Sequence, residues 1–200
     1  MSDFLILGQT TSYLEVLGII TGLLGVWLTV RQNILCFPVG IINVTIYAFM
    51  FSSEGIRLYA DALLQCIYLV LLIYGWINWK KNKKTILKNE MPKDTSATTI
   101  ILISVIAFIS LSIFLGKYTD ASLPWLDSAL TVLSLVAQWM VARKMIANWI
   151  IWIIVNVVYI PLYFYKSLPL TSALYFVFLI LAVKGYSDWK KEFNNSNSIS

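Results

Sequence analysis

The chain has 200 residues, of which 59% are hydrophobic and only 12% are charged. This composition excludes a water-soluble globular domain and predicts an integral membrane protein. The formal net charge is +5, and the chain has two cysteines and no histidine, which excludes histidine metal sites and histidine-based catalytic triads. The sequence also lacks a G-x-x-x-x-G-K-[ST] phosphate loop. We therefore expect no cofactor, no metal and no enzymatic activity.

Seven apolar stretches follow one another along the chain. A helix needs about 20 residues to cross a bilayer core of about 30 Å. The stretches predict transmembrane helices at about 13–30, 37–51, 59–79, 98–116, 127–143, 148–165 and 168–189. The second stretch is short for a span. Together they predict an all-α fold with seven transmembrane helices.

An odd number of spans places the two termini on opposite sides of the membrane. Most of the 15 basic residues then fall on one side, and only Arg57, Lys117 and Lys166 fall on the other. Basic residues favour the cytoplasmic side, so we expect the N-terminus outside and the C-terminus in the cytoplasm. The run Lys80–Lys93 is interpreted as a topology signal in a cytoplasmic loop, and no nucleic-acid partner is expected.

The chain carries an internal repeat. The first half recurs 112 positions later at Trp27/Trp139, Arg31/Arg143, Phe37/Trp149 and Tyr47/Tyr159, and 110 positions later at Gly75/Gly185 and Trp79/Trp189. We expect a three-helix repeat at 13–81, a linker helix at 98–116, a second three-helix repeat at 125–191 and a polar cytoplasmic tail at 192–200. The single linker helix gives both repeats the same orientation. The sequence thus predicts 3+1+3 parallel repeats, with a substrate site between them.

The sixth predicted helix has the densest set of candidate binding residues. Steps of three and four residues place Trp149, Trp152, Asn156, Tyr159 and Tyr163 on one face. Aromatic faces attract a delocalised cation, and an amide hydrogen-bonds hydroxyl or carboxamide groups. This pattern predicts a site for a cationic, ring-containing molecule.

The other helices add further candidates. Phe37, Asn43 and Tyr47 repeat the aromatic and amide pattern on the second helix, with the amide one position out of register. Polar side chains inside a span are costly and therefore informative. The polar candidates within the predicted spans are Gln65 and Tyr68 on the third helix, and Thr131 and Gln138 on the fifth.

Other tryptophans and two acidic residues have a structural explanation. Trp76, Trp79, Trp125 and Trp189 lie at predicted helix ends, where tryptophan is typical of the membrane interface. Glu15 and Asp127 begin equivalent helices, where a carboxylate complements the helix dipole; the functional alternative is an outer vestibule that attracts cations. No buried carboxylate–base chain indicates ion coupling, and this favours passive transport.

Four motifs resemble the PnuC family of vitamin transporters. They are [WF]-P-x-G at Phe37–Gly40, Y-A-D at Tyr59–Asp61, N-W-x-x-W-x-x-x-N at Asn148–Asn156 and L-Y-x-Y-K at Leu162–Lys166. The resemblance runs over nearly the whole chain except the loop around the linker and the polar tail. One departure is Phe37, where many relatives have tryptophan.

The resemblance implies a fold, a mechanism and partners. Members of this family are SWEET-like homotrimers of the bacterial inner membrane that pass nicotinamide riboside by facilitated diffusion. A cytoplasmic kinase then phosphorylates the nucleoside and traps it for NAD salvage. By the family's pattern, Trp152, Asn156 and Tyr159 would line the site from the second repeat, Asn43, Tyr47 and Gln65 from the first, and Gln138 would contact the ribose.

Other functions stay open at this point. Close siblings within the same family carry thiamine, which is also a cationic ring, or the larger neutral riboflavin. A cation–π argument does not separate thiamine from nicotinamide riboside. A seven-helix receptor would use Lys184 in the last helix, but this residue lies near the cytoplasmic end, where snorkelling explains it. A membrane enzyme would need catalytic groups that the sequence does not offer.

Overall fold

The computed structural model describes residues 3–6, 9–52, 59–81, 87, 96–119, 123–165 and 168–198. Within these residues the chain forms seven helices and one two-stranded antiparallel hairpin. The hairpin joins β1 (Asp3–Ile6) and β2 (Gln9–Ser12), and the sequence analysis did not predict it. Arg57 and most of the Lys80–Lys93 segment lie outside the described residues.

The helices confirm the predicted all-α architecture. Their bounds are α1 Tyr13–Val30, α2 Cys36–Ser52, α3 Tyr59–Lys81, α4 Ala97–Tyr118, α5 Pro124–Ala142, α6 Asn148–Tyr165 and α7 Pro169–Asn197. All lie within one turn of the predicted bounds except the end of α7, which continues through most of the predicted polar tail. Six of the described helices are long and apolar enough to cross a membrane, and α2 is shorter at 17 residues.

Local sequence sets where several helices begin and end. The Ser12 side chain accepts a hydrogen bond from the Glu15 amide and caps α1, as expected of an N-cap serine. At the other ends, α1 and α5 stop at the same kind of turn. Gln32 (φ 51°) and Lys144 (φ 56°) both adopt the left-handed conformation, which satisfies last-turn carbonyls by closing the helix. These two residues are 112 positions apart, so the repeat in the sequence is also a repeat in the turns.

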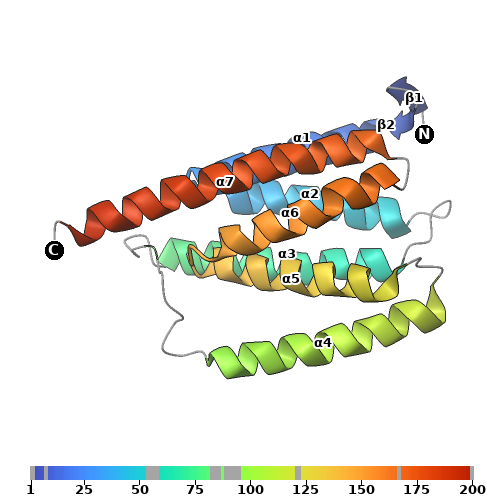
Figure 1. Ribbon diagram of the computed structural model, residues 1–200. Coiled ribbons are helices and arrows are strands. Elements are labelled where there is room, and N and C mark those ends of the chain that lie inside the picture. Colours follow the sequence, from blue (N-terminus) through green and yellow to red (C-terminus); the bar gives the residue numbers. More distant parts are fainter. Residues whose placement is uncertain are drawn as a thin grey trace.

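Six of the helices form a closed ring. Along the ring α1 packs on α2, α2 on α3, α3 on α5, α5 on α6, α6 on α7, and α7 on α1. The remaining helix, α4, lies outside the ring and packs on α5 (Figure 1). The half containing α1–α3 therefore meets the half containing α5–α7 at two interfaces, α3 with α5 and α7 with α1.

Helices α1, α3, α5 and α7 all run toward the side on which the C-terminus lies, at the left of Figure 1. This side carries the basic residues Arg31, Lys80, Lys81, Arg143, Lys144 and Lys190, and we call it the basic end. Four aromatic side chains pack together here: Phe37, Trp79, Trp149 and Trp189. We call this group the aromatic clasp.

The aromatic clasp depends on two glycines at equivalent positions. Phe37 packs so closely on Gly75 that an added Cβ would lie 2.3 Å from its ring, and Trp149 packs on Gly185 with a corresponding distance of 2.6 Å. Each of these rings then meets a tryptophan edge-on, at centroid distances of 5.0 Å (Phe37–Trp79) and 5.4 Å (Trp149–Trp189). The small residues thus let α2 approach α3, and α6 approach α7.

The clasp corrects one interpretation of the sequence. Trp79 and Trp189 were interpreted as interface residues, yet their exposed fractions are 4% and 0%. Both indoles point into the bundle, because each has a backbone carbonyl of another helix as hydrogen-bond acceptor there. Trp76 and Trp125, in contrast, are exposed on the outside of the bundle.

Replacing Gly75 or Gly185 by alanine is expected to lower the thermal stability of the detergent-solubilised protein. The added methyl group would overlap the Phe37 or Trp149 ring, and overpacking of this kind costs about 1–3 kcal/mol. Gly116→Ala is the matched control, since the nearest atom to its Cβ is 3.8 Å away. Equal unfolding temperatures for the clasp variants and this control would contradict the close packing.

Candidate functional site

A cavity of about 1710 Å³ lies inside the ring of helices and extends to α4. Residues of all seven helices line it. It is larger than a usual small-molecule pocket of about 300–1,000 Å³, because it includes the space beside α4. Toward the basic end the lining includes Phe37 and Trp149, whose side chains are buried in the aromatic clasp. The cavity therefore ends at the clasp.

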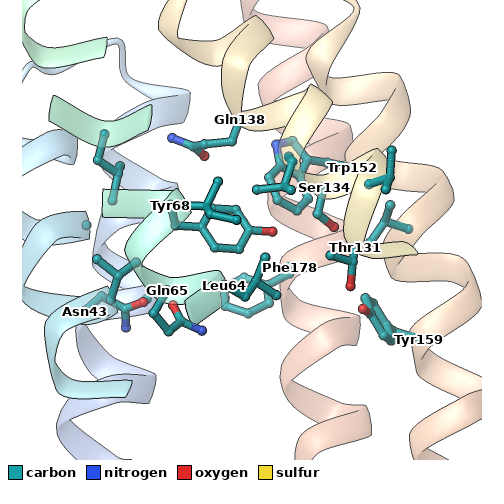
Figure 2. Close-up of a pocket in the computed structure, with 18 of the residues that line it drawn as sticks. Asn43, Leu64, Gln65, Tyr68, Thr131, Ser134, Gln138, Trp152, Tyr159 and Phe178 are labelled. Carbon is teal, nitrogen blue, oxygen red and sulfur yellow. The ribbon is translucent and has the colours of Figure 1, made fainter. Parts of the chain in front are cut away.

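The wall on the α2–α3 side is rich in amides. Figure 2 shows Asn43 on α2 and Gln65 on α3 side by side, both facing the cavity. The Asn43 amide nitrogen donates to the Gly18 carbonyl at 2.6 Å and to the Thr21 hydroxyl at 3.0 Å. These bonds hold α2 against α1 and use the donor of Asn43. Its carbonyl oxygen is left as the group that faces the cavity, and this oxygen is an acceptor.

Tyr68 crosses the middle of the cavity. Its ring projects from α3, and its hydroxyl points toward Ser134 on α5 (Figure 2). Gln138 lies one turn further along α5 and also faces the cavity. The approach of Tyr68 to Ser134 joins the two halves of the ring across the α3–α5 interface, inside the cavity.

The wall on the α6–α7 side is aromatic. Trp152 and Tyr159 project into the cavity from α6 (Figure 2). Tyr159, Tyr163 and Tyr175 form a compact group with centroid distances between 4.7 and 5.4 Å, and Phe178 meets Tyr175 edge-on. Four rings from two helices thus extend the aromatic face begun by Trp152.

Asn156 supports this wall from behind. Its side chain is only 4% exposed, and its amide nitrogen donates to the Trp152 carbonyl at 2.7 Å. Buried polar groups need such partners. Its oxygen is therefore the polar atom of Asn156 that remains for a bound molecule.

The structure brings together nine of the ten predicted site residues. The residues that line the cavity are Phe37, Asn43, Gln65, Tyr68, Gln138, Trp149, Trp152, Asn156 and Tyr159. Tyr47 is not among the lining residues. Its ring lies against Gly18 of α1 and stacks on Phe51 with a centroid distance of 5.8 Å, so the α1–α2 contact occupies it.

Sequence reasoning missed three of the residues that complete the site. Ser134, Tyr175 and Phe178 all line the cavity. The repeat offered a signal for two of them, because Tyr175 and Phe178 lie 110 positions after Gln65 and Tyr68. Ser134 had no such signal, since the equivalent position in the first half is Gly22.

The cavity contains little charge. Of the lining residues in the described part of the chain, Asp127 is the one with an ionisable carboxylate. The described residues also contain no group of three or more His, Cys, Asp or Glu side chains that could hold a metal ion. What the cavity offers is aromatic faces on one side and amides and hydroxyls on the other.

Comparison with known proteins now identifies the family. The family model described as "Nicotinamide mononucleotide transporter" matches residues 12–191. The chain belongs to this family. It is a multi-pass membrane transporter of the bacterial inner membrane and not an enzyme.

Individual relatives agree with this assignment. The chain is 28% identical to the nicotinamide riboside transporter PnuC of Escherichia coli (strain K12), over 91% of this chain and 87% of that protein. It is 27% identical to PnuC of Neisseria mucosa, over 90% and 73% of the two chains. It is 22% identical to the riboflavin/roseoflavin transporter RibM of Streptomyces davaonensis, over 93% and 88%.

A solved structure supports the fold. The crystal structure of the vitamin B3 transporter PnuC superposes with a TM-score of 0.67 at 25% sequence identity, covering 92% of this chain and 83% of that one. The all-helical, apolar architecture is therefore that of the transporter family.

The contact between Tyr68 and Ser134 is open to direct test. Tyr68→Phe and Ser134→Ala are each expected to lower the free energy of unfolding by about 0.6–1.5 kcal/mol, the contribution of a hydrogen bond between the two hydroxyls that approach each other across the α3–α5 interface. The double variant should lose no more than the larger single loss, since the bond can be broken only once. Thermal unfolding in detergent measures all three, and additive losses would contradict the contact.

Proposed function

We propose that this protein carries nicotinamide riboside across the bacterial inner membrane by facilitated diffusion. The observation that supports this proposal is the chemical contrast between the two walls of one cavity. An aromatic wall suits a flat, delocalised cation, and a wall of amide and hydroxyl groups suits a sugar. Nicotinamide riboside is a pyridinium cation joined to a ribose, so it has one part for each wall.

The proposed roles follow from the side chains that face the cavity. Trp152 and Tyr159 would hold the pyridinium ring through its face, while the Asn156 amide nitrogen is held by the backbone carbonyl of Trp152. On the opposite wall the Asn43 oxygen would accept a hydrogen bond from a ribose hydroxyl, because the Asn43 nitrogen is already engaged by α1. Gln65 and Gln138 would contact the ribose or the carboxamide.

The two most buried candidates have a different role in this proposal. Phe37 and Trp149 form the floor of the site at the aromatic clasp and pack on glycines. Tyr68 would contact the permeant with its ring, because its hydroxyl points toward Ser134 (Figure 2). Tyr47 would act through the α1–α2 packing and not by direct contact.

Passive transport fits the scarcity of charge in the cavity. Coupling to protons or ions needs titratable or charged groups along the path, and Asp127 alone supplies a carboxylate to the described lining. A passive carrier only equilibrates its permeant. Net uptake would then come from a cytoplasmic kinase, because phosphorylation adds charge and removes the free nucleoside from the equilibrium.

The proposed arrangement in the membrane has the N-terminus outside and the C-terminus in the cytoplasm. The concentration of basic residues at one end of the bundle supports this orientation. The equivalent turns at Gln32 and Lys144 support 3+1+3 parallel repeats of the SWEET type. A homotrimer is proposed from the family resemblance, and α4 is available for it, since none of its residues is buried.

A second vitamin is the alternative. The similarity to a riboflavin/roseoflavin transporter favours a sibling specificity, and thiamine would satisfy the aromatic wall equally well as a cation. The experiment is uptake of labelled nicotinamide riboside, thiamine and riboflavin into proteoliposomes without an ion gradient. Accumulation of nicotinamide riboside alone, and only to equilibrium, is the expected result. Preference for another vitamin, or accumulation above equilibrium, would refute the proposed substrate or the passive mechanism.

Trp152→Ala is expected to reduce uptake by at least about 30-fold while leaving assembly intact, because a desolvated cation–π contact contributes about 2 kcal/mol. Trp152→Phe, which keeps an aromatic face, should retain part of the activity. Trp125→Ala is the matched control, since Trp125 is 58% exposed and lies outside the cavity lining. Undiminished uptake by Trp152→Ala would place the binding site elsewhere.

A further inference from the structure

Two tryptophans fasten the two halves of the ring to each other at the basic end. The Trp79 indole N–H on α3 donates to the Val141 carbonyl at the end of α5, at 3.1 Å. The Trp189 indole N–H on α7 donates to the Val30 carbonyl at the end of α1, also at 3.1 Å. Each bond crosses one of the two interfaces between the halves, so neither half can move away at this end without breaking a bond.

The same two rings close the path between the halves. Trp79 and Trp189 approach each other with a centroid distance of 6.3 Å. Phe37 and Trp149, which form the end of the cavity, pack edge-on against them. All four side chains are buried. A molecule in the cavity meets these rings before it reaches the basic end.

A polar layer contacts the clasp next to the basic end. The Lys144 ammonium lies 4.9 Å from the centre of the Trp79 ring, and partial burial there lowers the pKa of Lys144, an effect that nearby Glu192 opposes. Glu192 also accepts a hydrogen bond from the Gln32 side chain. The extension of α7 past Trp189 therefore reaches the turn after α1 and lies close to the turn after α5.

We infer that Trp79 and Trp189 are the gate of the transport pathway at the basic end, and that the permeant passes only when both indole–carbonyl bonds break and the two halves separate there. The inference rests on the proposed function only in taking the cavity as the transport path. It does not depend on which vitamin is carried. Phenylalanine at either position keeps an aromatic ring and removes the N–H donor, so it isolates the bond from the packing.

The chain contains its own reporter for this opening. Cys36 is 4% exposed, lines the cavity and belongs to the same cluster of buried side chains as the clasp. In a Cys66→Ser background, Cys36 is the single thiol. Its rate of modification by a membrane-impermeant methanethiosulfonate, which forms a mixed disulfide with the thiol and releases methanesulfinate, reports how often the clasp is open. The rate is measured separately from each side of the membrane.

Trp79→Phe and Trp189→Phe are each expected to raise the labelling rate of Cys36 about five-fold, the effect of one lost hydrogen bond on an opening equilibrium. The increase should occur only from the side on which an added Ser198→Cys, at the end of α7, is labelled in a parallel sample. Trp27→Phe is the matched control, because Trp27 is an exposed tryptophan of α1 outside the clasp that carries the Arg31 guanidinium over its ring.

Three results would overturn the gate. One is an unchanged labelling rate in both variants while size-exclusion chromatography shows intact protein. Another is an equal increase in the Trp27→Phe control. The third is an equal increase from both sides of the membrane, which would mean general loosening of the bundle. None of these results depends on vitamin uptake, so failure of the gate and failure of the proposed substrate remain distinguishable.

Discussion

Among the glycines of the described chain, the two with the least room for a Cβ atom are each covered by an aromatic ring of the neighbouring helix, Gly75 by Phe37 and Gly185 by Trp149. In a bilayer, apolar side chains gain little by leaving lipid for another helix, so close shape fit and hydrogen bonds have to hold the helices together. The two glycines supply that fit at equivalent places in the two halves. They set the spacing of α2 from α3 and of α6 from α7. The position of the clasp, and hence the end of the cavity, depends on this spacing.

The two halves share a backbone plan but differ in chemistry where they face the cavity. Gln65 in the first half corresponds to Tyr175 in the second, and Gly40 corresponds to Trp152. A strictly repeated cavity would present the same groups on both walls. Substitution at these few positions gives one amide-rich wall and one aromatic wall. Our proposed site would therefore hold a molecule with two unlike ends in one preferred orientation.

The outer helix α4 differs from the six helices of the ring in its surroundings. Its side chains are apolar on all faces and none is buried, because the ring is already closed by the other six helices. Its contacts within the described chain are with α5. Helix α4 thus packs against the ring without contributing a buried core.

Much of this protein was determined by the sequence itself. Hydropathy and length identify helices because every backbone polar group in a bilayer must be satisfied within the segment, and the spacing of 112 residues predicts the two halves. The stripe from Trp152 to Tyr159 was found because residues on one helix face keep their relation in any packing. The family motifs indicated the transporter family, which the comparisons confirm.

Only the tertiary structure decided how each helix is rotated and which partner it meets. It turned Trp79 and Trp189 inward to carbonyls of α5 and α1, and it directed Tyr47 against α1 and away from the cavity. It also brought Ser134 to the Tyr68 hydroxyl. These relations are absent from local sequence, because a helix that is apolar all round has no hydrophobic face to set its rotation. Shape fit to its neighbours and a few long-range hydrogen bonds set it instead.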